Sequence, residues 1–281
     1  MTTETVDRAQ LARSAHRYLE PLHTLVYFVP ENAERYQALG IKGGMRGYFA
    51  SRSAPLGLVP AEVVVSTFYN FSSAAVRKAI PSVWEVTTPQ AVLDARLDGA
   101  DAALRRLLGD AVDSAEMARA AELAREATTV LDVAGRPLYA GHAALPWPEP
   151  AHLQLWHAAT LLREHRGDGH IAALVLAGLS GLDASLTYVA TGKSMPEDIQ
   201  RQTRGYSEEE WGAAKQRLTD DGLLDAAGGL TDRGQALRSG IEAQTDAAAA
   251  APYDHLGPDR TQELIDLTRP CARSIAKQIF G

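Results

Sequence analysis

The chain has 281 residues, more than one domain usually contains, so we expect two domains or one domain with a large extension. Hydrophobic residues make up 46% and charged residues 22% of the sequence, which is typical of folded globular proteins and excludes a disordered chain. No stretch reaches the apolar length that crossing a bilayer requires, so we expect no membrane partner. The formal net charge of −7 disfavours nucleic acid as a partner, because duplex binding draws much of its affinity from neutralised phosphates.

The start of the chain and its cysteine content both bear on the compartment. The N-terminal segment has neither the apolar core nor the cleavage-site pattern of a signal peptide. Cys271 is the only cysteine, so the chain cannot form an internal disulfide. Both features predict a cytoplasmic protein.

Helical patterns dominate the first half of the chain. Pro30 opens one helix, and Thr88 followed by Pro89 is typical of the N-terminus of another. The run Gly43–Phe49, rich in glycine and aromatic residues, predicts a packed loop, and the segment after Pro60 fits either a helix or a strand. The predicted helices of this half cover residues 6–29, 30–39, 74–80, 89–108 and 113–131.

A cluster of prolines predicts the boundary between two domains. Four of the 14 prolines fall at residues 137–150, within the stretch 133–150. We therefore expect an N-terminal helical domain at residues 1–132, a linker at 133–150 and a second domain at 151–281. The first domain could itself be a divergent helix-turn-helix, although no internal repeat is visible.

The second half begins with an amphipathic helix over residues 153–165. Arg166–Gly169 predicts a glycine turn, and the apolar segment after it predicts a buried helix. Ser207, with Glu210 three residues later, has the pattern of a capping box, so a helix is expected over residues 207–221. Two short extended pieces and a long helix follow, which predicts a small hairpin between two helices.

This order of elements resembles the winged helix of MarR-type (multiple antibiotic resistance) regulators, in which a recognition helix, a wing and a dimerisation helix follow one another. The motifs RLTDDGLL and LTDRGQAL carry the resemblance, over residues 195–246. Through WHAATLLREHRGDGH, GYFASRSAPLG and PYDHLG, the whole chain resembles a little-characterised actinobacterial family of SalK-like or MarR-like winged-helix proteins. The resemblance implies a mainly α fold, with an N-terminal helical domain and a C-terminal winged helix-turn-helix that has a short two-stranded wing. The function it implies is that of a ligand-responsive transcription regulator.

The predicted recognition helix is poorly suited to DNA. Its N-terminal end, Glu208–Trp211, lacks the Arg, Lys, Asn or Gln side chains that contact base edges. Over residues 207–221, Lys215 and Arg217 stand against five acidic residues, a net charge of −3 that repels phosphate. The predicted wing is short and has no arginine at its tip. The acidic first turn also has a structural explanation, since it favours a helix N-terminus.

The densest polar cluster of the chain is Arg163–His170. His165, Asp168 and His170 could act there as general acids or bases on a small molecule. The structural alternative assigns the cations to the C-terminal end of one helix and Asp168 to the N-cap of the next. We expect no metal site, because two histidines five positions apart across a glycine differ from the i, i+4 pair of a zinc-binding helix. The chain has no nucleophile elbow and no dinucleotide fingerprint, so the sequence specifies no cofactor and leaves catalysis undecided.

Aromatic residues supply the predicted ligand-binding site. Trp156 and His157 lie just before the polar cluster, although a lone histidine on such a helix face is more often a hydrogen-bonded core group. We expect Tyr69 and Phe71 to line an apolar pocket with Arg52 as a polar anchor, the usual composition of small-molecule sites, and ordinary core packing is the alternative. The other aromatic candidates are Tyr48, Phe49, Phe68 and Trp84.

The predicted function is the binding of a small organic molecule on a degenerate winged-helix scaffold, with acid/base chemistry on the ligand as an extension. DNA is a disfavoured partner. One alternative is a MarR-type, ligand-responsive transcription regulator. Another is a protein-interaction module that uses the acidic recognition helix as its contact surface. The sequence leaves the oligomeric state and the identity of the ligand open.

Overall fold

The computed structural model describes residues 8–280, so the expected start of the first helix at residue 6 lies outside the described residues. Within this range the chain consists of α-helices, short 3-10 turns and loops, and no β-strand occurs. The α-helices are α1 (Arg8–Thr24), α2 (Pro30–Ala38), α3 (Gly44–Ser53), α4 (Ala61–Thr67), α5 (Ser73–Ala79), α6 (Pro89–Leu108), α7 (Ala115–Thr128), α8 (Pro137–Ala143), α9 (Ala151–Leu176), α10 (Gly181–Val189), α11 (Glu197–Arg204), α12 (Glu208–Asp220), α13 (Asp232–Ala248), α14 (Ala251–Leu256) and α15 (Pro258–Phe280). The 3-10 turns are η1 (Leu25–Tyr27), η2 (Ala54–Leu56), η3 (Ser82–Glu85) and η4 (Gly109–Asp113).

The chain divides into two compact units. The first comprises the described residues up to Leu58, Trp84–Asp168 and the residues from Asp246 onwards, and the second comprises Val59–Val83 and Gly169–Thr245. Both units combine segments from the two halves of the sequence, and α9 and α13 each run from one unit into the other. The proline-rich stretch 133–150, the expected linker, lies inside the first unit around α8.

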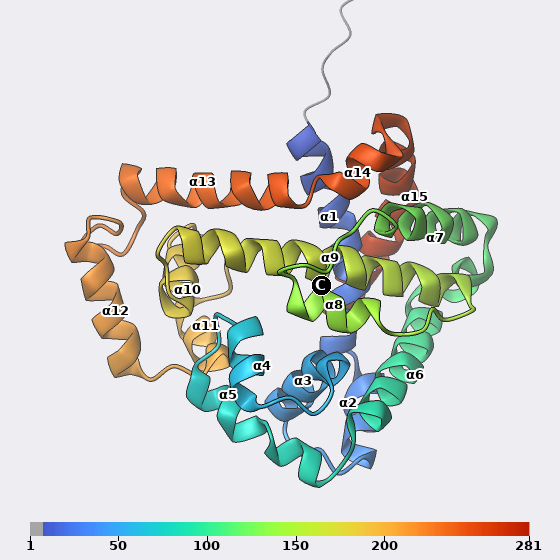
Figure 1. Cartoon of the computed structure of the whole chain (residues 1–281), viewed down its shortest axis with the longest axis horizontal. Helices are drawn as coiled ribbons and strands as arrows, with labels where there is room; N and C mark the ends of the chain where they lie inside the picture. The colour runs from blue at the N-terminus through green and yellow to red at the C-terminus, as the bar shows by residue number, and fades with distance from the viewer. Residues whose placement is uncertain (1–7, 281) are drawn as a thin grey trace, which may run out of the picture. The chain divides into compact units, whose positions relative to one another are not determined.

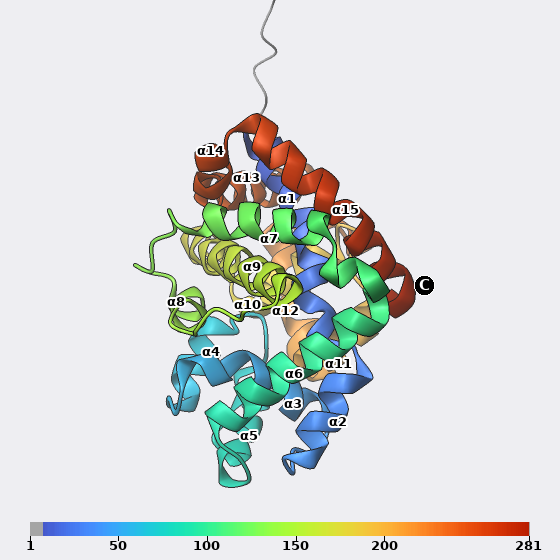
Figure 2. The same ribbon diagram turned by 90° about the vertical axis from the view of Figure 1, so that its right-hand side faces the viewer.

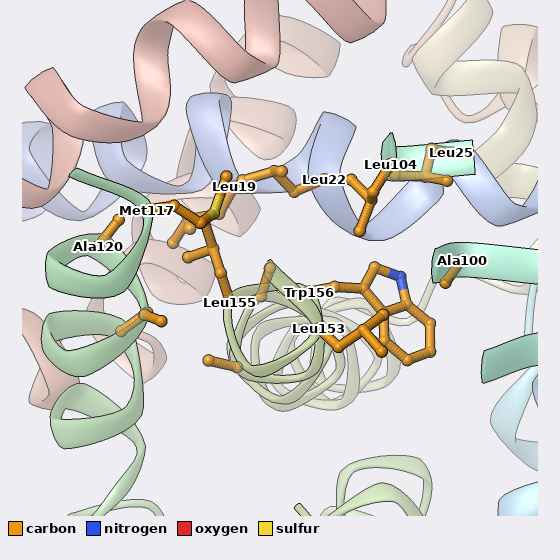
Figure 3. Packing of buried hydrophobic residues seen from close by; sticks show 14 of the residues in the cluster. Leu19, Leu22, Leu25, Ala100, Leu104, Met117, Ala120, Leu153, Leu155 and Trp156 are labelled. Atoms are coloured by element: carbon orange, nitrogen blue, oxygen red, sulfur yellow. The ribbon is translucent and has the colours of Figure 1, made fainter. Parts of the chain in front are cut away.

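The core of the first unit forms around the N-terminal half of α9. Leu155 and Trp156 are 1% and 5% exposed, and they pack with Leu19 and Leu22 of α1 and Met117 of α7 (Figure 3). α15 packs along both α1 and α7 (Figure 2), and α2, α3 and α6 lie side by side in the same unit (Figure 1). Each large apolar side chain buried in this way contributes about 1.5–3 kcal/mol. This packing fixes α9 and therefore positions the polar side chains that follow on the same helix.

α9 is one continuous helix, so the glycine turn expected at residues 166–169 is wrong. Gly167 costs a helix interior about 1 kcal/mol relative to alanine. The neighbouring Arg166 helps to offset this cost, because its Nη2 lies 2.8 Å from Oδ1 of the buried Asp246.

Within residues 8–280 no single helix has the length and apolar composition needed to cross a membrane. α9 and α10 meet these criteria only when they are taken as a pair, across a bend of 99°.

α3 replaces the loop expected at Gly43–Phe49. Gly43 has a φ of 88° directly before the helix, a conformation that favours glycine. The helix then forms in spite of its glycines because it buries Phe49, which is 1% exposed. A Cβ at Gly47 would lie 3.2 Å from a ring carbon of Tyr36, so the glycine allows α2 and α3 to pack closely.

The second unit contains a helix-turn-helix formed by α11 and α12. Gly205 ends α11 in the left-handed conformation, and Ser207 and Glu210 form the capping box that begins α12. The Trp211 Nε1 donates to Glu197 Oε1 at 2.8 Å, which fixes α12 against the start of α11. The capped helix predicted at this position is confirmed.

The expected two-stranded wing is wrong. Among the described residues the wing is a turn with one isolated antiparallel bridge, between Leu224 and Leu230. The Asp225 N–H donates to the Gly229 carbonyl at 2.9 Å, and the Asp225 carboxylate accepts from the Gly229 N–H at 2.9 Å. Asp225, the first residue of the turn, therefore closes it. Because α13 begins at Asp232, no residues remain for a longer pair of hydrogen-bonded strands.

A close backbone approach in the second unit makes Gly181 sensitive to substitution. A Cβ at this first residue of α10 would lie 1.8 Å from the Tyr69 carbonyl oxygen. We expect Gly181→Ala to lower the free energy of unfolding by about 1–3 kcal/mol, as overpacking does, in urea unfolding followed by circular dichroism. Gly240→Ala on α13 meets open space, and we expect it to leave stability unchanged or to raise it by about 0.5–1 kcal/mol. Equal stabilities for the two variants would contradict this packing.

Candidate functional site

The three predicted acid/base residues have structural partners. Asp168 Oδ2 accepts a hydrogen bond of 2.9 Å from the Tyr139 N–H in the first turn of α8, so this carboxylate caps that helix. The His165 ring packs edge to face on the Tyr139 ring, with centroids 5.2 Å apart. Both residues belong to the first unit, whereas His170 belongs to the second, where its Nδ1 lies 2.8 Å from Thr245 Oγ1. A catalytic role for the three residues stays a prediction.

Two of the predicted ligand-binding residues belong to the second unit. The Tyr69 hydroxyl donates to the Leu179 carbonyl oxygen. Phe71 is 5% exposed, and the guanidinium carbon of Arg204 lies 4.5 Å from its ring centroid. These contacts are those of packed core residues.

The other three predicted ligand-binding residues belong to the first unit. Arg52, Trp156 and His157 are 7%, 5% and 4% exposed. The His157 ring packs edge to face on Trp147, with centroids 4.8 Å apart. The Trp156 ring lies against the guanidinium of Arg96, whose Cζ is 5.3 Å from the ring centroid. This arginine was not among the predicted site residues.

A pocket of about 170 Å³ lies in the first unit among η1, α2 and α3. Ala33 and Gly44 are exposed at its mouth, while Tyr36 and Ser51 are buried in its lining. The predicted aromatic residue Tyr48 also lines it. The lining residues are Val26, Tyr27, Val29, Ala33, Tyr36, Gln37, Ile41, Gly43, Gly44, Gly47, Tyr48 and Ser51.

Two hydroxyl groups of the lining are hydrogen-bonded to buried arginines. Ser51 Oγ accepts from Arg96 Nη1 at 2.7 Å and from the Tyr36 hydroxyl at 2.9 Å. A hydroxyl oxygen has two lone pairs and one proton, so the Ser51 proton remains to be donated. The Tyr48 hydroxyl accepts from Arg52 Nη1 at 3.0 Å. Each of the two hydroxyls is therefore polarised by the positive charge of the arginine that donates to it.

Arg96 is buried, and it has no counter-ion among residues 8–280. It is 1% exposed, and within residues 8–280 it forms no ion pair and its Nε and Nη2 have no hydrogen-bond partner. The ring centroids of Tyr27 and Trp156 lie 5.4 and 5.3 Å from its Cζ. Each cation–π contact of this kind contributes about 0.5–2 kcal/mol, less than the several kcal/mol, in order of magnitude, that desolvating a charge costs. An anion near Ser51 would supply the missing negative charge.

Glu164 does not serve as that counter-ion, because other arginines share it. Its Oε2 lies 2.7 Å from Arg163 Nη1 and 3.2 Å from Arg52 Nη2. Burial raises the pKa of this carboxyl, but the charges of Arg163 and Arg52 outweigh burial and hold the pKa of Glu164 well below its ordinary value. Glu164 is therefore ionised and paired, and the uncompensated positive charge remains at Arg96.

A hydrogen-bond chain sets the direction of the Tyr27 hydroxyl. The Thr160 hydroxyl donates to the Trp156 carbonyl at 3.0 Å, so its oxygen accepts from His23 Nδ1 at 3.1 Å. Burial lowers the pKa of His23 well below its ordinary value, so the ring is neutral and its Nε2 carries no proton. The Tyr27 hydroxyl therefore donates to His23 Nε2 at 3.2 Å. In the pocket Tyr27 offers an acceptor, whereas Ser51 offers a donor.

Arg96 and His23 were missed by the sequence prediction, and Glu164 lay inside the polar run Arg163–His170 without a role of its own, although the sequence held a signal for Arg96. Arg96 lies four residues after Val92 and four before Ala100, on the buried stripe of α6. A charged side chain on an apolar helix stripe costs free energy unless a partner or a function requires it. This position on α6 was therefore the signal for Arg96, while the polar run at residues 163–170 contained only Glu164 of the three.

Buried histidines of the first unit predict a loss of stability in acid. Burial lowers the pKa of His142 to about 3 and that of His157 to about 4. The unfolded chain takes up these protons near pH 6.5, so the stability that the neutral rings contribute is present at pH 7 and falls as the pH drops below 6.5. Each buried ring is expected to lower the free energy of unfolding by about 2 kcal/mol between pH 7 and pH 5. Asp168 has the opposite effect on stability. Burial raises its pKa to about 6, so the folded state binds a proton before the unfolded state does as the pH falls.

Urea unfolding of the wild type and of His142→Gln, at pH 7 and at pH 5, measures this effect. The variant lacks one titrating ring, so its loss of stability between the two pH values should be smaller by about 2 kcal/mol. Equal losses would show that this ring is protonated in the folded protein or is not buried.

The helix-turn-helix of the second unit has an acidic surface. Glu208–Glu210 are exposed in the first turn of α12. Lys215 Nζ lies 3.0 Å from Glu197 Oε1, and Arg217 pairs with Asp183. The second unit contains nine Lys and Arg against twelve Asp and Glu, a net charge of −3. The cations of α12 are thus neutralised within the unit.

Residues 12–280 match the model of a family described as "Helix-turn-helix family". No curated protein and no solved structure matches the chain. The narrower resemblance to MarR-like and SalK-like proteins stays a prediction. Because the matched residues span most of its length, the chain belongs to this helix-turn-helix family.

Proposed function

We propose that the first unit binds a small organic anion, recognised through a carboxylate, in the pocket among η1, α2 and α3. Arg96 carries the proposal: its guanidinium is 1% exposed, it forms no ion pair within residues 8–280, and it donates to Ser51 in the pocket lining. A carboxylate that accepts the Ser51 proton enters the field of this cation. The bound anion offsets a charge that has no ion-pair partner in the part of the chain that the structure describes.

The size and lining of the pocket limit the ligand. A volume of about 170 Å³ is close to the roughly 150 Å³ of an apolar cavity that accommodates benzene. Val26, Val29 and Ile41 supply apolar surface, and three tyrosines supply rings with polar tips. A monocarboxylate with about one ring, or a branched chain of similar size, fits this description.

Isothermal titration calorimetry with benzoate and benzamide at pH 7 tests the proposal. The two probes have nearly the same shape, but only benzoate is charged. Hydrogen bonds to charged groups contribute about 1.5–3 kcal/mol, so benzoate should bind at least about tenfold more tightly than benzamide. Equal affinities would contradict anion recognition, and the absence of binding by either probe would contradict the pocket as a site for ligands of this size.

Transcription regulation is a second candidate function, and membership of a helix-turn-helix family favours it. The exposed acidic turn of α12 opposes it, as do the ion pairs of Lys215 and Arg217, because phosphate contacts supply much of the affinity for DNA. We therefore expect titration of a fluorescent, random duplex at low salt to show no binding at submicromolar protein. Tight binding that weakens steeply with added salt would favour the regulator.

A further inference from the structure

A second pocket, of about 340 Å³, lies in the first unit among η4, the start of α7, α9 and α15. Its floor consists of the buried side chains of Met117, Ala120 and Leu155 (Figure 3). Leu267 and Cys271 of α15 form a half-buried wall. The second pocket shares no lining residue with the pocket among η1, α2 and α3, and its apolar interior favours hydrocarbon.

The charged residues at the rim of the second pocket are acidic. Glu116 and Asp266 both line it and are exposed, and its described lining contains no lysine or arginine. Glu116 forms no ion pair within residues 8–280, whereas Asp266 Oδ1 lies 2.8 Å from Arg269 Nη2 on the same helix. Glu116 therefore leaves one negative charge at the rim without an ion pair among residues 8–280, and this charge favours a cation over an anion.

Pro270 changes the backbone hydrogen bonding at the same rim. It lies inside α15, and because proline has no backbone N–H it cannot donate the helix hydrogen bond to the carbonyl of Asp266, four residues earlier. Both residues belong to the pocket lining. The turn of α15 at this rim therefore lacks one of its usual backbone hydrogen bonds.

We propose that the second pocket binds a primary alkylammonium compound, with the alkyl chain on the floor formed by Met117 and Leu155 and the ammonium group at the rim between Glu116 and Asp266. An ammonium group has three N–H donors and no acceptor. It therefore matches the carboxylates of the rim, whereas a carboxylate with the same chain matches neither of them. The two pockets of the first unit then select ligands of opposite charge.

The Cys271 thiol provides a direct assay, because it is the only cysteine of the chain and lies in the wall of the second pocket. Burial raises the pKa of this thiol, so it reacts slowly and its rate of alkylation depends on access. The rate of labelling by a maleimide is measured by mass spectrometry with octylamine or octanoate, which have similar tails and opposite charges. We expect octylamine to slow labelling by about tenfold or more, and octanoate to leave the rate within about twofold of the free protein.

Matched variants separate charge recognition from general effects of an amphiphile. Glu116→Gln should weaken the octylamine protection by about tenfold, since it removes the rim carboxylate that has no internal partner. Glu122→Gln, an exposed position on the same helix outside the pocket lining, should keep the protection. Calorimetry with octylamine on Cys271→Ser should give the same affinity as the wild type, because the thiol serves only as the reporter.

Three results would overturn the proposal. Equal protection by octanoate would show that the rim does not select charge. The absence of protection by either probe would show that the pocket does not bind alkyl chains. Labelling that slows with protein concentration, without any probe, would show that a second copy of the chain covers the pocket instead.

Discussion

Glu164→Gln is expected to lower the free energy of unfolding by about 3–5 kcal/mol, the cost of breaking a buried ion pair. The Glu164 carboxylate is 1% exposed and lies within 3.2 Å of Arg163 and Arg52. Glutamine keeps the shape of the side chain but removes its charge, so two guanidiniums lose their shared partner. The pKa of Glu164 is held well below its ordinary value, so this stabilisation is present at pH 7 and is lost only as the pH falls through the low folded-state pKa. Urea unfolding at pH 7 measures the difference.

Glu263→Gln is the matched control, because it removes an ion pair of similar geometry at the surface. Glu263 Oε1 lies 2.8 Å from Arg119 Nε, and the two side chains are 40% and 37% exposed. We expect this variant to lose less than about 1 kcal/mol, as exposed pairs do. Equal stabilities of Glu164→Gln and Glu263→Gln would contradict this account. They would show that Glu164 is not the anion that neutralises Arg163 and Arg52.

Arg96→Met is expected to abolish most of the benzoate affinity without destabilising the protein. Arg96 acts on the ligand through its charge and through Ser51. A charge a few ångströms away is worth about 1.5–3 kcal/mol at an effective dielectric constant of about 20, which corresponds to about 10- to 150-fold weaker binding. Methionine fills similar space between Tyr27 and Trp156 and has no charge to desolvate, so the free energy of unfolding should stay within about 1 kcal/mol of the wild type or rise. Calorimetry measures the affinity, and urea unfolding measures the stability of the same samples.

Arg105→Met tests whether loss of any α6 arginine has this effect. Its side chain is 46% exposed and pairs with Asp101 at 3.0 Å, and it does not line the pocket. We expect it to bind benzoate as the wild type does. Benzoate affinity that survives in Arg96→Met, or falls equally in both variants, would contradict the role of Arg96. A large destabilisation of Arg96→Met would instead assign this arginine to the structure of the core.

Helix starts were predictable from the sequence because their chemistry is local. Thr88 accepts from the Ala91 N–H and Ser207 from the Glu210 N–H, as the caps in the sequence predict. The helix breaks were less predictable, because packing overrode propensity. Gly167 lies inside α9, as the glycines of α3 lie inside that helix, in both cases beside buried side chains that stabilise the continuous helix.

The proposed binding site was predictable only in part, because it depends on long-range contacts. Arg52 was expected to be a polar anchor, and it contacts the pocket through the Tyr48 hydroxyl. Tyr69 and Phe71 were expected to line the same pocket; they belong to the second unit, and their role in a site stays a prediction. Whether Arg96 has a counter-ion depends on which carboxylates the fold brings near it, and sequence spacing does not supply that information.

A crystal structure of the protein soaked with 4-bromobenzoate tests anion recognition most directly, because the anomalous signal of bromine locates the ligand. We predict a bromine peak at the mouth of the first pocket, near Ala33 and Gly44, with the carboxylate within hydrogen-bond distance of Ser51 Oγ. A ligand held elsewhere, or a first pocket that stays empty at concentrations that saturate the calorimetric titration, would contradict the assignment of this pocket to organic anions.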